Sequence, residues 1–302
     1  MSLMLHIPVL LQPVLQYLQI EAGVFVDGTF GAGGYTRAIL SAHPQARVIA
    51  FDRDPTTKVH AEKVQQEFPD RFTFIQDCFG NMTAHLSEPV NGLVLDIGVS
   101  SMQIDQPERG FSLRFDGPLD MRMGPEGPTA AEVIKSVSEK QLADILFKYG
   151  EEKCSHRIAK VLKECKPETT LQMAEAIHAV MPRPTDGSDS ATRSFQALRI
   201  FVNNELGELE KALTASLDLL KPHGRLAVVS FHSLEDRIVK DFLNEHSSKT
   251  RHINKYAKQQ PQKGAFEILT KKPIVADKEE LLRNPRAHSA KLRVAERTEV
   301  PA

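Results

Sequence analysis

Hydrophobic and polar positions along the first hundred residues form short β-rich runs that alternate with segments of helical length. The predicted strands span residues 24–26, 47–51, 72–75 and 92–95, and the predicted helices between them span 36–42 and 56–68. Strands that alternate with helices are typical of βαβ units, whose right-handed crossovers place the strands parallel in one sheet. The pattern therefore predicts an α/β fold for this part of the chain.

The alternation stops after Asp96. Residues 105–128 are rich in glycine, proline and aspartate, which predicts an ordered loop. Apolar residues then recur at helical spacing up to residue 181, and Gly150 is expected to end one of these helices. Capping boxes, in which a hydroxyl and a later side chain satisfy free backbone donors, are predicted at Thr129 with Glu132, Ser138 with Gln141 and Thr169 with Gln172.

Strand character returns late in the chain. A helical stretch from about 194 to 220 precedes a strand at 226–231, and residues 265–270 and 291–296 form a final predicted strand pair. A sheet that starts, pauses and resumes predicts one α/β domain that carries an inserted all-helical domain. The predicted division gives 1–105 and 191–302 to the α/β domain, and 106–190 to the inserted loop and helical domain.

Composition places the chain among ordinary globular proteins. Its 302 residues are 41% hydrophobic and 25% charged, with 38 basic and 39 acidic side chains, which excludes collagen-like, low-complexity and disordered classes. No apolar run approaches the roughly 18 residues that span a bilayer, and the interrupted apolar start at 4–15 is not expected to be a secretory signal. Three scattered cysteines, Cys78, Cys154 and Cys165, predict a cytoplasmic protein without disulfides or a metal site.

Residues 244–264 are polar and rich in lysine and glutamine. From Lys249 to Lys272 there are seven Lys or Arg residues and one acid, Glu267. Two interpretations stay open for this stretch. It is either a solvated loop or a segment that contacts phosphates, because basic patches supply sequence-independent affinity for nucleic acid.

The strongest chemical signal is a glycine-rich turn between a strand and a helix, at Val26–Thr36 (VDGTFGAGGYT). Glycines in such a turn let the backbone approach a ligand without a Cβ in the way. Asp52 follows the next strand, nineteen residues after Gly33, where a carboxylate can accept both hydroxyl protons of a ribose. The combination predicts a cofactor that carries adenosine.

The spacing of the glycines favours S-adenosylmethionine over a dinucleotide. A dinucleotide loop would need a third glycine where Thr36 stands, after Gly31 and Gly33, and no Walker A sequence is present. Three predicted strands end in aspartates, Asp27, Asp52 and Asp96. Their position agrees with a bound cofactor, because open α/β sheets bind ligands in the crevice at the carboxyl ends of their strands.

Several long motifs follow one another along nearly the whole chain. They are DGTFGAGG at 27–34, DRDP at 52–55, DIGVSS at 96–101, ERGFS at 108–112, DGPLDMRM at 116–123, YGEE at 149–152, ATRSFQALRI at 191–200, VSFHSLEDRIVK at 229–240 and NPRAHSAKLR at 284–293. Together they resemble the bacterial ribosomal small-subunit methyltransferase H family, also called MraW. The resemblance implies a Rossmann-like class I S-adenosylmethionine-dependent methyltransferase sheet.

The resemblance also implies a reaction, which is transfer of a methyl group to the exocyclic N4 of a cytosine in the decoding region of 16S rRNA in the small ribosomal subunit. The implied cofactor-binding positions are Gly33, Gly34 and Tyr35 for the methionine end, Asp52 for the ribose, Phe79 for the adenine region, and Asp96 and Gln103. This chain has Tyr35 where the family usually has histidine, and DGSDS at 186–190 where the family has a basic lead-in. The oligomeric state, including a homodimer, stays open.

Methylation of this amine needs acceptors for its two N–H groups, because its lone pair is delocalised into the ring. Asp96, at the end of the fourth strand, is a candidate for contact with the cofactor or the amine. His232, after the fifth strand, is expected either to orient the base or contact a phosphate, or to have a structural role. Candidates for RNA contact are Arg109, Asp120, Arg122 and Arg193. Ion pairs that shape their own segments are the competing interpretation for these four.

Three other functions compete with this one. A DNA amino-methylase usually carries [DNS]-P-P-[YFW] after the fourth strand, whereas this chain has DIGV at 96–99. An NAD-dependent oxidoreductase would need the missing third glycine. A non-catalytic RNA-binding assembly factor would bind the cofactor without turnover, and the intact glycine loop and Asp52 count against it.

Overall fold

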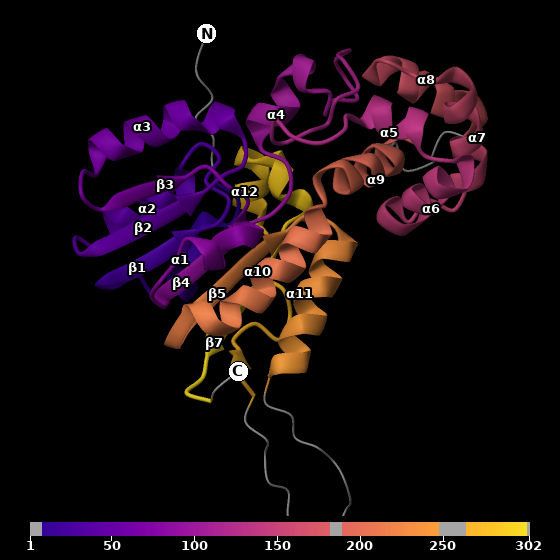
Figure 1. Cartoon of the computed structure of the whole chain (residues 1–302). Coiled ribbons are helices and arrows are strands. Elements are labelled where there is room, and N and C mark those ends of the chain that lie inside the picture. The colour runs from indigo at the N-terminus through magenta and orange to yellow at the C-terminus, as the bar shows by residue number, and fades with distance from the viewer. Residues whose placement is uncertain (1–7, 182–188, 248–263, 301–302) are drawn as a thin grey trace, which may run out of the picture. The chain divides into compact units, whose positions relative to one another are not determined.

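The computed structural model describes residues 8–181, 189–247 and 264–300 of the chain. Its strands are β1 (Gly23–Asp27), β2 (Ala46–Phe51), β3 (Phe72–Ile75), β4 (Val90–Asp96), β5 (Leu220–Ser230), β6 (Phe266–Ile268) and β7 (Lys291–Arg297). They form one sheet in the order β3-β2-β1-β4-β5-β7-β6 (Figure 1). The pairs from β3 to β5 are parallel, and β7 runs antiparallel to both β5 and β6. The fold is therefore Rossmann-like α/β with one antiparallel edge.

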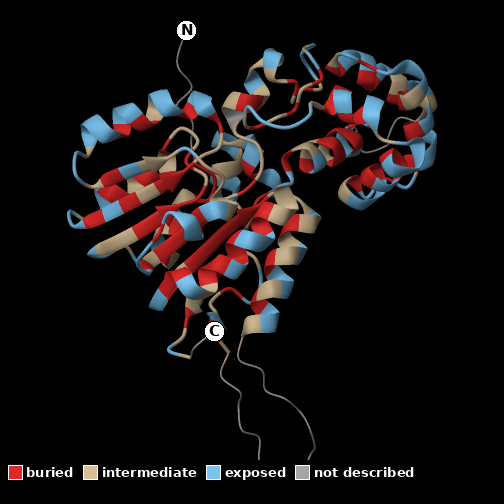
Figure 2. Cartoon of the chain, in the orientation of Figure 1, coloured by how far each residue is buried: buried red, intermediate tan, exposed pale blue. Residues whose placement is uncertain are grey.

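Helices cover both faces of this sheet. They are α1 (Leu11–Leu18), α2 (Gly34–Ala42), α3 (Lys58–Glu67), α10 (Glu205–Leu219) and α11 (Ser233–His246). Successive strand residues point to opposite faces, so Phe25 of β1 packs into the core under α1, α2 and α3, while Val26 packs into the core under α10 and α11. Buried residues accordingly fill the central strands (Figure 2).

The strand predictions for this unit are confirmed. The four early strands occur where the sequence places them, and the final pair is an antiparallel ladder in which Phe266 lies opposite Arg297. The hydrophobic pattern does not predict α1. That helix accommodates Pro13 because a proline in the first turn removes an N–H group that no helical carbonyl could have satisfied.

The second compact unit, Val99–Leu206, is inserted into the first between Gly98 and Gly207. Its helices are α4 (Ser101–Asp105), α5 (Ala130–Ser136), α6 (Glu139–Gly150), α7 (Ser155–Cys165), α8 (Thr170–Val180) and α9 (Thr192–Asn203). They enclose a separate core that includes Leu142, Ile158 and Met173. The predicted boundaries at 105/106 and 190/191 fall inside this unit, so α4 and α9 belong to it rather than to the sheet-containing unit.

The helix starts of the second unit follow the predicted capping chemistry with one exception. Capping boxes are present at Thr129 and Ser138. The hydroxyl of Thr169 accepts from the N–H of Gln172 at 3.4 Å, but the Gln172 side chain accepts from the N–H of Glu168 at 2.9 Å instead of completing a box. The N–H of Glu168 therefore takes the amide oxygen of Gln172 that a capping box would direct to the N–H of Thr169.

The structure confirms that α6 ends at Gly150. The left-handed residue after this helix is Glu151, with φ of 51°, and Gly150 is the last helical residue. Glycine is needed at 150 for a different reason, because an added Cβ would lie 2.5 Å from the carbonyl oxygen of Arg193. Close approach of two helices, rather than backbone reversal, explains this glycine.

The structure also tests the predicted helical stretch at 194–220 and the predicted loop at 105–128. The helical stretch expected over 194–220 is two helices separated by Asn204, which has φ of 49°. The loop at 105–128 is ordered, and its Leu119 and Asp120 carbonyls accept from the first N–H groups of α5.

Most of the basic stretch, 248–263, and residues 182–188 lie outside the described residues. None of the helices that the structure describes has the length and apolar character to cross a membrane.

Candidate functional site

Three aspartates gather where parallel strands of the sheet end. Asp27 ends β1, Asp96 ends β4, and Asp52 directly follows β2. β1 lies between β2 and β4, and the register places Asp27 opposite Ala50 on one side and Val94 on the other. Because the carboxyl ends of parallel strands meet at the same edge, the three side chains face one region of the first unit.

The glycine loop runs from β1 into α2 with a tight backbone. The N–H of Gly28 donates to the carbonyl of Val94 at 2.9 Å, and the N–H of Gly33 donates to that of Phe30 at 2.7 Å. Gly33 has φ of 78°, and an added Cβ would lie 2.9 Å from the Phe30 ring. The loop therefore requires glycine at 33, and it presents the first N–H groups of α2, which no helical carbonyl can satisfy.

Asp27 is fully buried and ties the two ends of the loop together. One carboxylate oxygen accepts from the N–H of Thr29 at 3.2 Å, and the other accepts from the hydroxyl of Thr36 at 2.7 Å. Burial raises the pKa of Asp27 to about 6, although these hydrogen bonds favour the ionised form. The contacts give Asp27 a structural role, which its position at a strand end does not reveal.

Asp52 connects the end of β2 to the middle of the same loop. Its Oδ2 accepts from the N–H of Gly31 at 2.8 Å, and its Oδ1 accepts from the N–H of Asp54 at 2.8 Å. Burial raises the pKa of Asp52 to about 6, and the neighbouring carboxylates of Asp54 and Asp27 add to the shift. Each oxygen keeps a lone pair for a further hydrogen bond, such as one from a ribose hydroxyl.

Asp96 differs from the other two aspartates in its hydrogen bonding. Its N–H donates to the hydroxyl of Thr29 at 2.7 Å, but its carboxylate Oδ1 is buried and has no hydrogen-bond partner among the described residues. Burial raises the pKa of Asp96 well above its usual value, and Asp27 and Glu235 add to the shift. Since a buried oxygen without a partner is costly, this carboxylate is suited to a ligand that supplies a donor or a positive charge.

His232 and Glu235 form the start of α11. The Nδ1 of His232 accepts from the N–H of Glu235 at 3.4 Å, and its Nε2 lies 2.9 Å from Oε1 of Glu235. The other oxygen of Glu235 accepts from the N–H groups of Phe231 at 2.8 Å and His232 at 3.2 Å. These contacts favour the structural interpretation of His232, and they place the buried acid Glu235 near Asp96.

The structure also places the remaining predicted cofactor residues. Phe79 begins the 3-10 helix after β3 and lies beside the glycine loop, because a Cβ on Gly28 would be 3.2 Å from its Cβ. Gly34 and Tyr35 open α2. Gln103 belongs to the second unit, where its Oε1 accepts from the N–H of Ser100 at 3.0 Å in a capping box of α4. Gly33, Gly34, Tyr35, Asp52, Phe79 and Asp96 therefore come together in the first unit, and Gln103 lies in the other.

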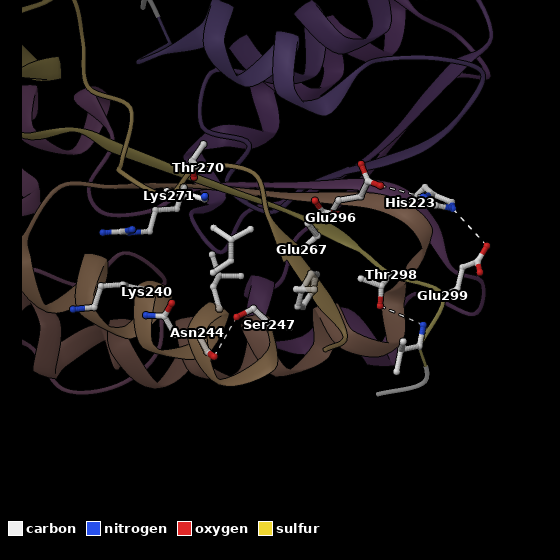
Figure 3. Close-up of a pocket in the computed structure, with 15 residues that line it drawn as sticks. His223, Lys240, Asn244, Ser247, Glu267, Thr270, Lys271, Glu296, Thr298 and Glu299 are labelled. Atoms are coloured by element: carbon white, nitrogen blue, oxygen red, sulfur yellow. Dashed lines mark hydrogen bonds and ion pairs between the residues drawn. The ribbon is translucent and has the colours of Figure 1, made fainter. Parts of the chain in front are cut away.

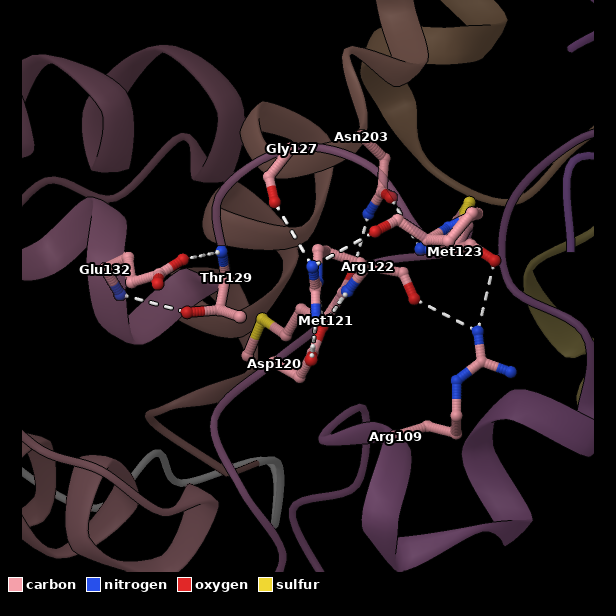
Figure 4. Close-up of polar contacts among 10 residues, drawn as sticks. Arg109, Asp120, Met121, Arg122, Met123, Gly127, Thr129, Glu132 and Asn203 are labelled. Carbon is pink, nitrogen blue, oxygen red and sulfur yellow. Dashed lines mark hydrogen bonds and ion pairs between the residues drawn. The ribbon is translucent and has the colours of Figure 1, made fainter.

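The loop of the second unit directs its charged groups to its own backbone (Figure 4). The guanidinium of Arg122 forms two hydrogen bonds with the carboxylate of Asp120, both 2.8 Å long, and it reaches the carbonyls of Pro125 and Gly127. Burial opposes ionisation of Asp120, but the hydrogen bonds from Arg122 outweigh it and lower the pKa of Asp120. These contacts favour loop shaping over RNA contact for this pair.

Arg109 forms internal polar contacts, as Arg122 does, whereas the Arg193 side chain forms none among the described residues. Arg109 donates to the carbonyls of Arg122 and Met123, at 3.0 and 3.1 Å, and its guanidinium lies 6.0 Å from the centre of the Phe111 ring. Arg193 on α9 is exposed, and within the described part of the chain its side chain forms no hydrogen bond or ion pair. Of the four RNA candidates, Arg193 is thus the one whose charge is presented to solvent.

A separate groove of about 890 Å³ lies between α11, β6 and β7 (Figure 3). Basic and acidic side chains line it together, and His223 in it is paired with Glu296 at 3.0 Å. None of the predicted cofactor residues lines this groove. No cluster of three or more histidine, cysteine or acidic side chains suited to a metal ion occurs among the described residues.

The strand order, the glycine loop after β1 and the carboxylate after β2 define a class, the Rossmann-like S-adenosylmethionine-dependent methyltransferases. A family model described as the MraW methylase family matches residues 3–298. The chain belongs to this family.

Two relatives extend over almost the whole chain. The "Ribosomal RNA small subunit methyltransferase H" of Paramagnetospirillum magneticum is 50% identical, over 98% of this chain and 97% of its own length. The protein of that name from Rhodospirillum rubrum is 48% identical, over 98% of this chain and 95% of its own. A crystal structure of an rRNA methylase from Streptococcus thermophilus is 12% identical, covers 96% of this chain and 94% of that one, and has a TM-score of 0.42.

Sequence reasoning missed two contributors to this site. Thr36 anchors Asp27, and Glu235 adds negative charge near Asp96. The spacing His232-x-x-Glu235 repeats that of a capping box with histidine in place of the hydroxyl residue, so the pattern itself holds the signal. No comparable local signal identifies Thr36 as the partner of a buried carboxylate.

Proposed function

We propose that this methyltransferase acts in the cytoplasm on 16S rRNA of the small ribosomal subunit, transferring the methyl group of S-adenosylmethionine to the exocyclic N4 of a cytosine. Membership of the MraW family and the names of its relatives support the rRNA target. The observation that carries the chemistry is the buried carboxylate of Asp96, which has one oxygen without a partner beside the glycine loop.

The residues of the first unit fit the cofactor. The N–H groups at Gly34 and Tyr35 open α2 and suit the carboxylate of the methionine end, with Gly33 providing the close backbone approach. Asp52 has acceptor capacity for the ribose, and Phe79 offers a half-buried ring for the adenine. The family pattern also implies Gln103, which belongs to the second unit, as a cofactor-binding residue.

Asp96 is the proposed acceptor for the target amine. Bound S-adenosylmethionine supplies a methyl group on a positively charged sulfur. As the bond from N4 to that methyl carbon forms and the carbon–sulfur bond breaks, the amine nitrogen becomes positively charged and must lose a proton. The unpaired oxygen of Asp96 would accept a hydrogen bond from N4 and then take this proton, while the cofactor would leave as neutral S-adenosylhomocysteine. Before transfer, the positive charge of the cofactor would favour the ionised form of Asp96.

His232 is proposed to act indirectly. It fixes Glu235 at the start of α11, and Glu235 is one of the two acids whose charge raises the pKa of Asp96. His232 is thus a positioning residue for the charge around Asp96. For RNA contact, exposed Arg193 is the strongest of the four candidates, because a guanidinium without internal partners can pair with a phosphate.

The test is methyl transfer from labelled S-adenosylmethionine to three substrates, followed by nucleoside analysis. The substrates are small subunits that lack the modification, naked 16S rRNA and duplex DNA. Label in N4-methylcytidine from either RNA substrate supports the proposal, and the better substrate identifies the assembly stage that is recognised. Label in DNA would favour a methylase of another nucleic acid. Cofactor binding without label in any substrate would favour a non-catalytic RNA-binding assembly factor.

A further inference from the structure

Residues 8–10 pack directly against the glycine loop. Pro8, Val9 and Leu10 are all buried. A Cβ added to Gly34 would overlap the ring of Pro8, with Cγ as its nearest atom. Gly34 is therefore glycine because a proline lies on it, and not because of its φ angle, which lies outside the left-handed region. The segment 8–10 is called the N-terminal strap below.

The side chain of Tyr35 ties the strap to the loop. Its hydroxyl donates to the carbonyl of Val9, and the side chain is buried, with 3% of the residue exposed. Burial raises the pKa of Tyr35 well above its usual value, with Asp96 and Asp27 adding to the shift, so the phenol keeps its proton and its donor role. Tyr35, the second residue of α2, is thereby held in place through its side chain rather than through its backbone.

A third contact holds the far end of the strap. The N–H of Leu10 donates to Oε1 of Glu280 at 2.6 Å, from the C-terminal helix α12 (Lys278–Arg283). Leu10 has φ of 53°, a left-handed conformation that is unfavourable for a non-glycine residue. The strap keeps this conformation because contacts on both sides specify it, from the glycine loop and from α12.

We propose that Tyr35 is a positioning residue for the cofactor, which acts by clamping the strap onto the glycine loop, with Glu280 as the second anchor of the clamp. Pro8 covers one side of Gly34, and the bond from Tyr35 to Val9 holds the first turn of α2 against it. The backbone N–H groups at 34 and 35 are thus held in place for the methionine end. The inference rests on the proposed cofactor site, not on the rRNA target.

The clamp predicts different effects on ligands with and without the methionine carboxylate. S-adenosylmethionine and S-adenosylhomocysteine both carry the methionine carboxylate that the clamped N–H groups would bind. 5′-Methylthioadenosine has the same adenosine part but no aminocarboxylate. Loosening the clamp should therefore weaken the first two ligands by the same factor and leave the third unchanged, whereas a general loss of folding would weaken all three.

The experiment measures the three dissociation constants by titration calorimetry for Tyr35→Phe, which keeps the ring and removes the donor. We expect about 10-fold weaker binding of S-adenosylmethionine and S-adenosylhomocysteine, a change of less than twofold for 5′-methylthioadenosine, and a higher KM for S-adenosylmethionine with kcat nearly unchanged. Tyr17→Phe removes a hydroxyl of α1 that forms no hydrogen bond among the described residues, and it is the matched control.

Glu280 supplies a second, independent arm. Glu280→Gln keeps an oxygen that can accept from Leu10 and should bind like the wild type, while Glu280→Ala should repeat the Tyr35→Phe pattern more weakly. Unchanged binding of all ligands by Tyr35→Phe, or equal weakening of all three, would overturn the proposal. Because the readout is binding, absence of rRNA methylation would refute the proposed target and leave this test intact.

Discussion

The glycine loop at 28–34 and the loop at 105–128 are both rich in glycine and surrounded by charge, yet they use their charged groups differently. In the second loop, Arg122, Asp120 and Arg109 all bond to one another or to backbone carbonyls. Beside the first loop, Asp27 and Asp52 likewise hold backbone N–H groups, but Asp96 keeps one buried oxygen without a partner. The unsatisfied buried group, rather than the density of glycine and charge, separates a ligand site from a scaffold.

The largest effect is expected at Asp96. Asp96→Asn keeps the size of the side chain but cannot take a proton or balance positive charge, so kcat for methyl transfer should fall about 100-fold or more. Single-turnover rates with saturating cofactor measure this. Asp218→Asn, on the exposed face of α10, is the control and should retain the wild-type rate. A full rate for Asp96→Asn would mean that another group accepts the amine N–H.

The next effect concerns the scaffold side of the comparison. Arg122→Gln removes the two-pronged contact with Asp120 and both carbonyl contacts, and it should lower the free energy of unfolding by about 1–2 kcal/mol. Urea denaturation provides the measurement. Arg193→Gln removes an arginine that is exposed to solvent and should change stability by less than about 0.5 kcal/mol. Equal losses for the two variants would contradict the distinction drawn between the two arginines.

The smallest expected effect is on the pH dependence of stability without cofactor. The pKa of Asp52 in the folded chain, about 6, exceeds its usual value of 3.8, so its contribution to stability is complete below the lower value and is lost as pH rises through the higher one. Asp52→Asn should remove about 1–2 kcal/mol of this decline between pH 4 and 7. The exposed Glu267→Gln is the control, and a slope unchanged by Asp52→Asn would count against the raised pKa.

Local chemistry explains which parts of the fold could be predicted. The strands follow from runs of β-branched and apolar residues, and the caps at Thr129 and Ser138 depend on four consecutive residues each. The cap at Thr169 differs because Glu168 competes for the same amide oxygen. Gly150 and Gly34 are glycines for reasons of close packing against distant residues, and such packing has no signature in the neighbouring sequence.

The residues of the candidate site likewise divide into those that local sequence predicts and those that depend on distant contacts. The glycine loop and Asp52 are recognisable from their spacing, because the turn and the following strand fix where they lie. The different hydrogen bonding of the Asp27 and Asp96 carboxylates is not recognisable from spacing. Asp27 accepts from the hydroxyl of Thr36, whereas Oδ1 of Asp96 has no partner among the described residues. The internal pairing of Arg122 requires the folded path of its loop. The anchoring of Tyr35 to Val9 joins residues that lie 26 positions apart in the chain.

The insertion of the second unit between β4 and β5 has a consequence for the order of folding. These strands are parallel neighbours, with Asp96 opposite Val229, although more than a hundred residues separate them in the chain. During synthesis, one edge of β4 keeps unpaired backbone groups until β5 has emerged after the insert, and an unpaired strand edge favours misassembly. Folding of the insert brings its ends together and lowers the entropy cost of closing this long loop. The strand that carries Asp96 therefore gains its second neighbour late, so the nascent chain completes the Asp96 edge after the glycine loop.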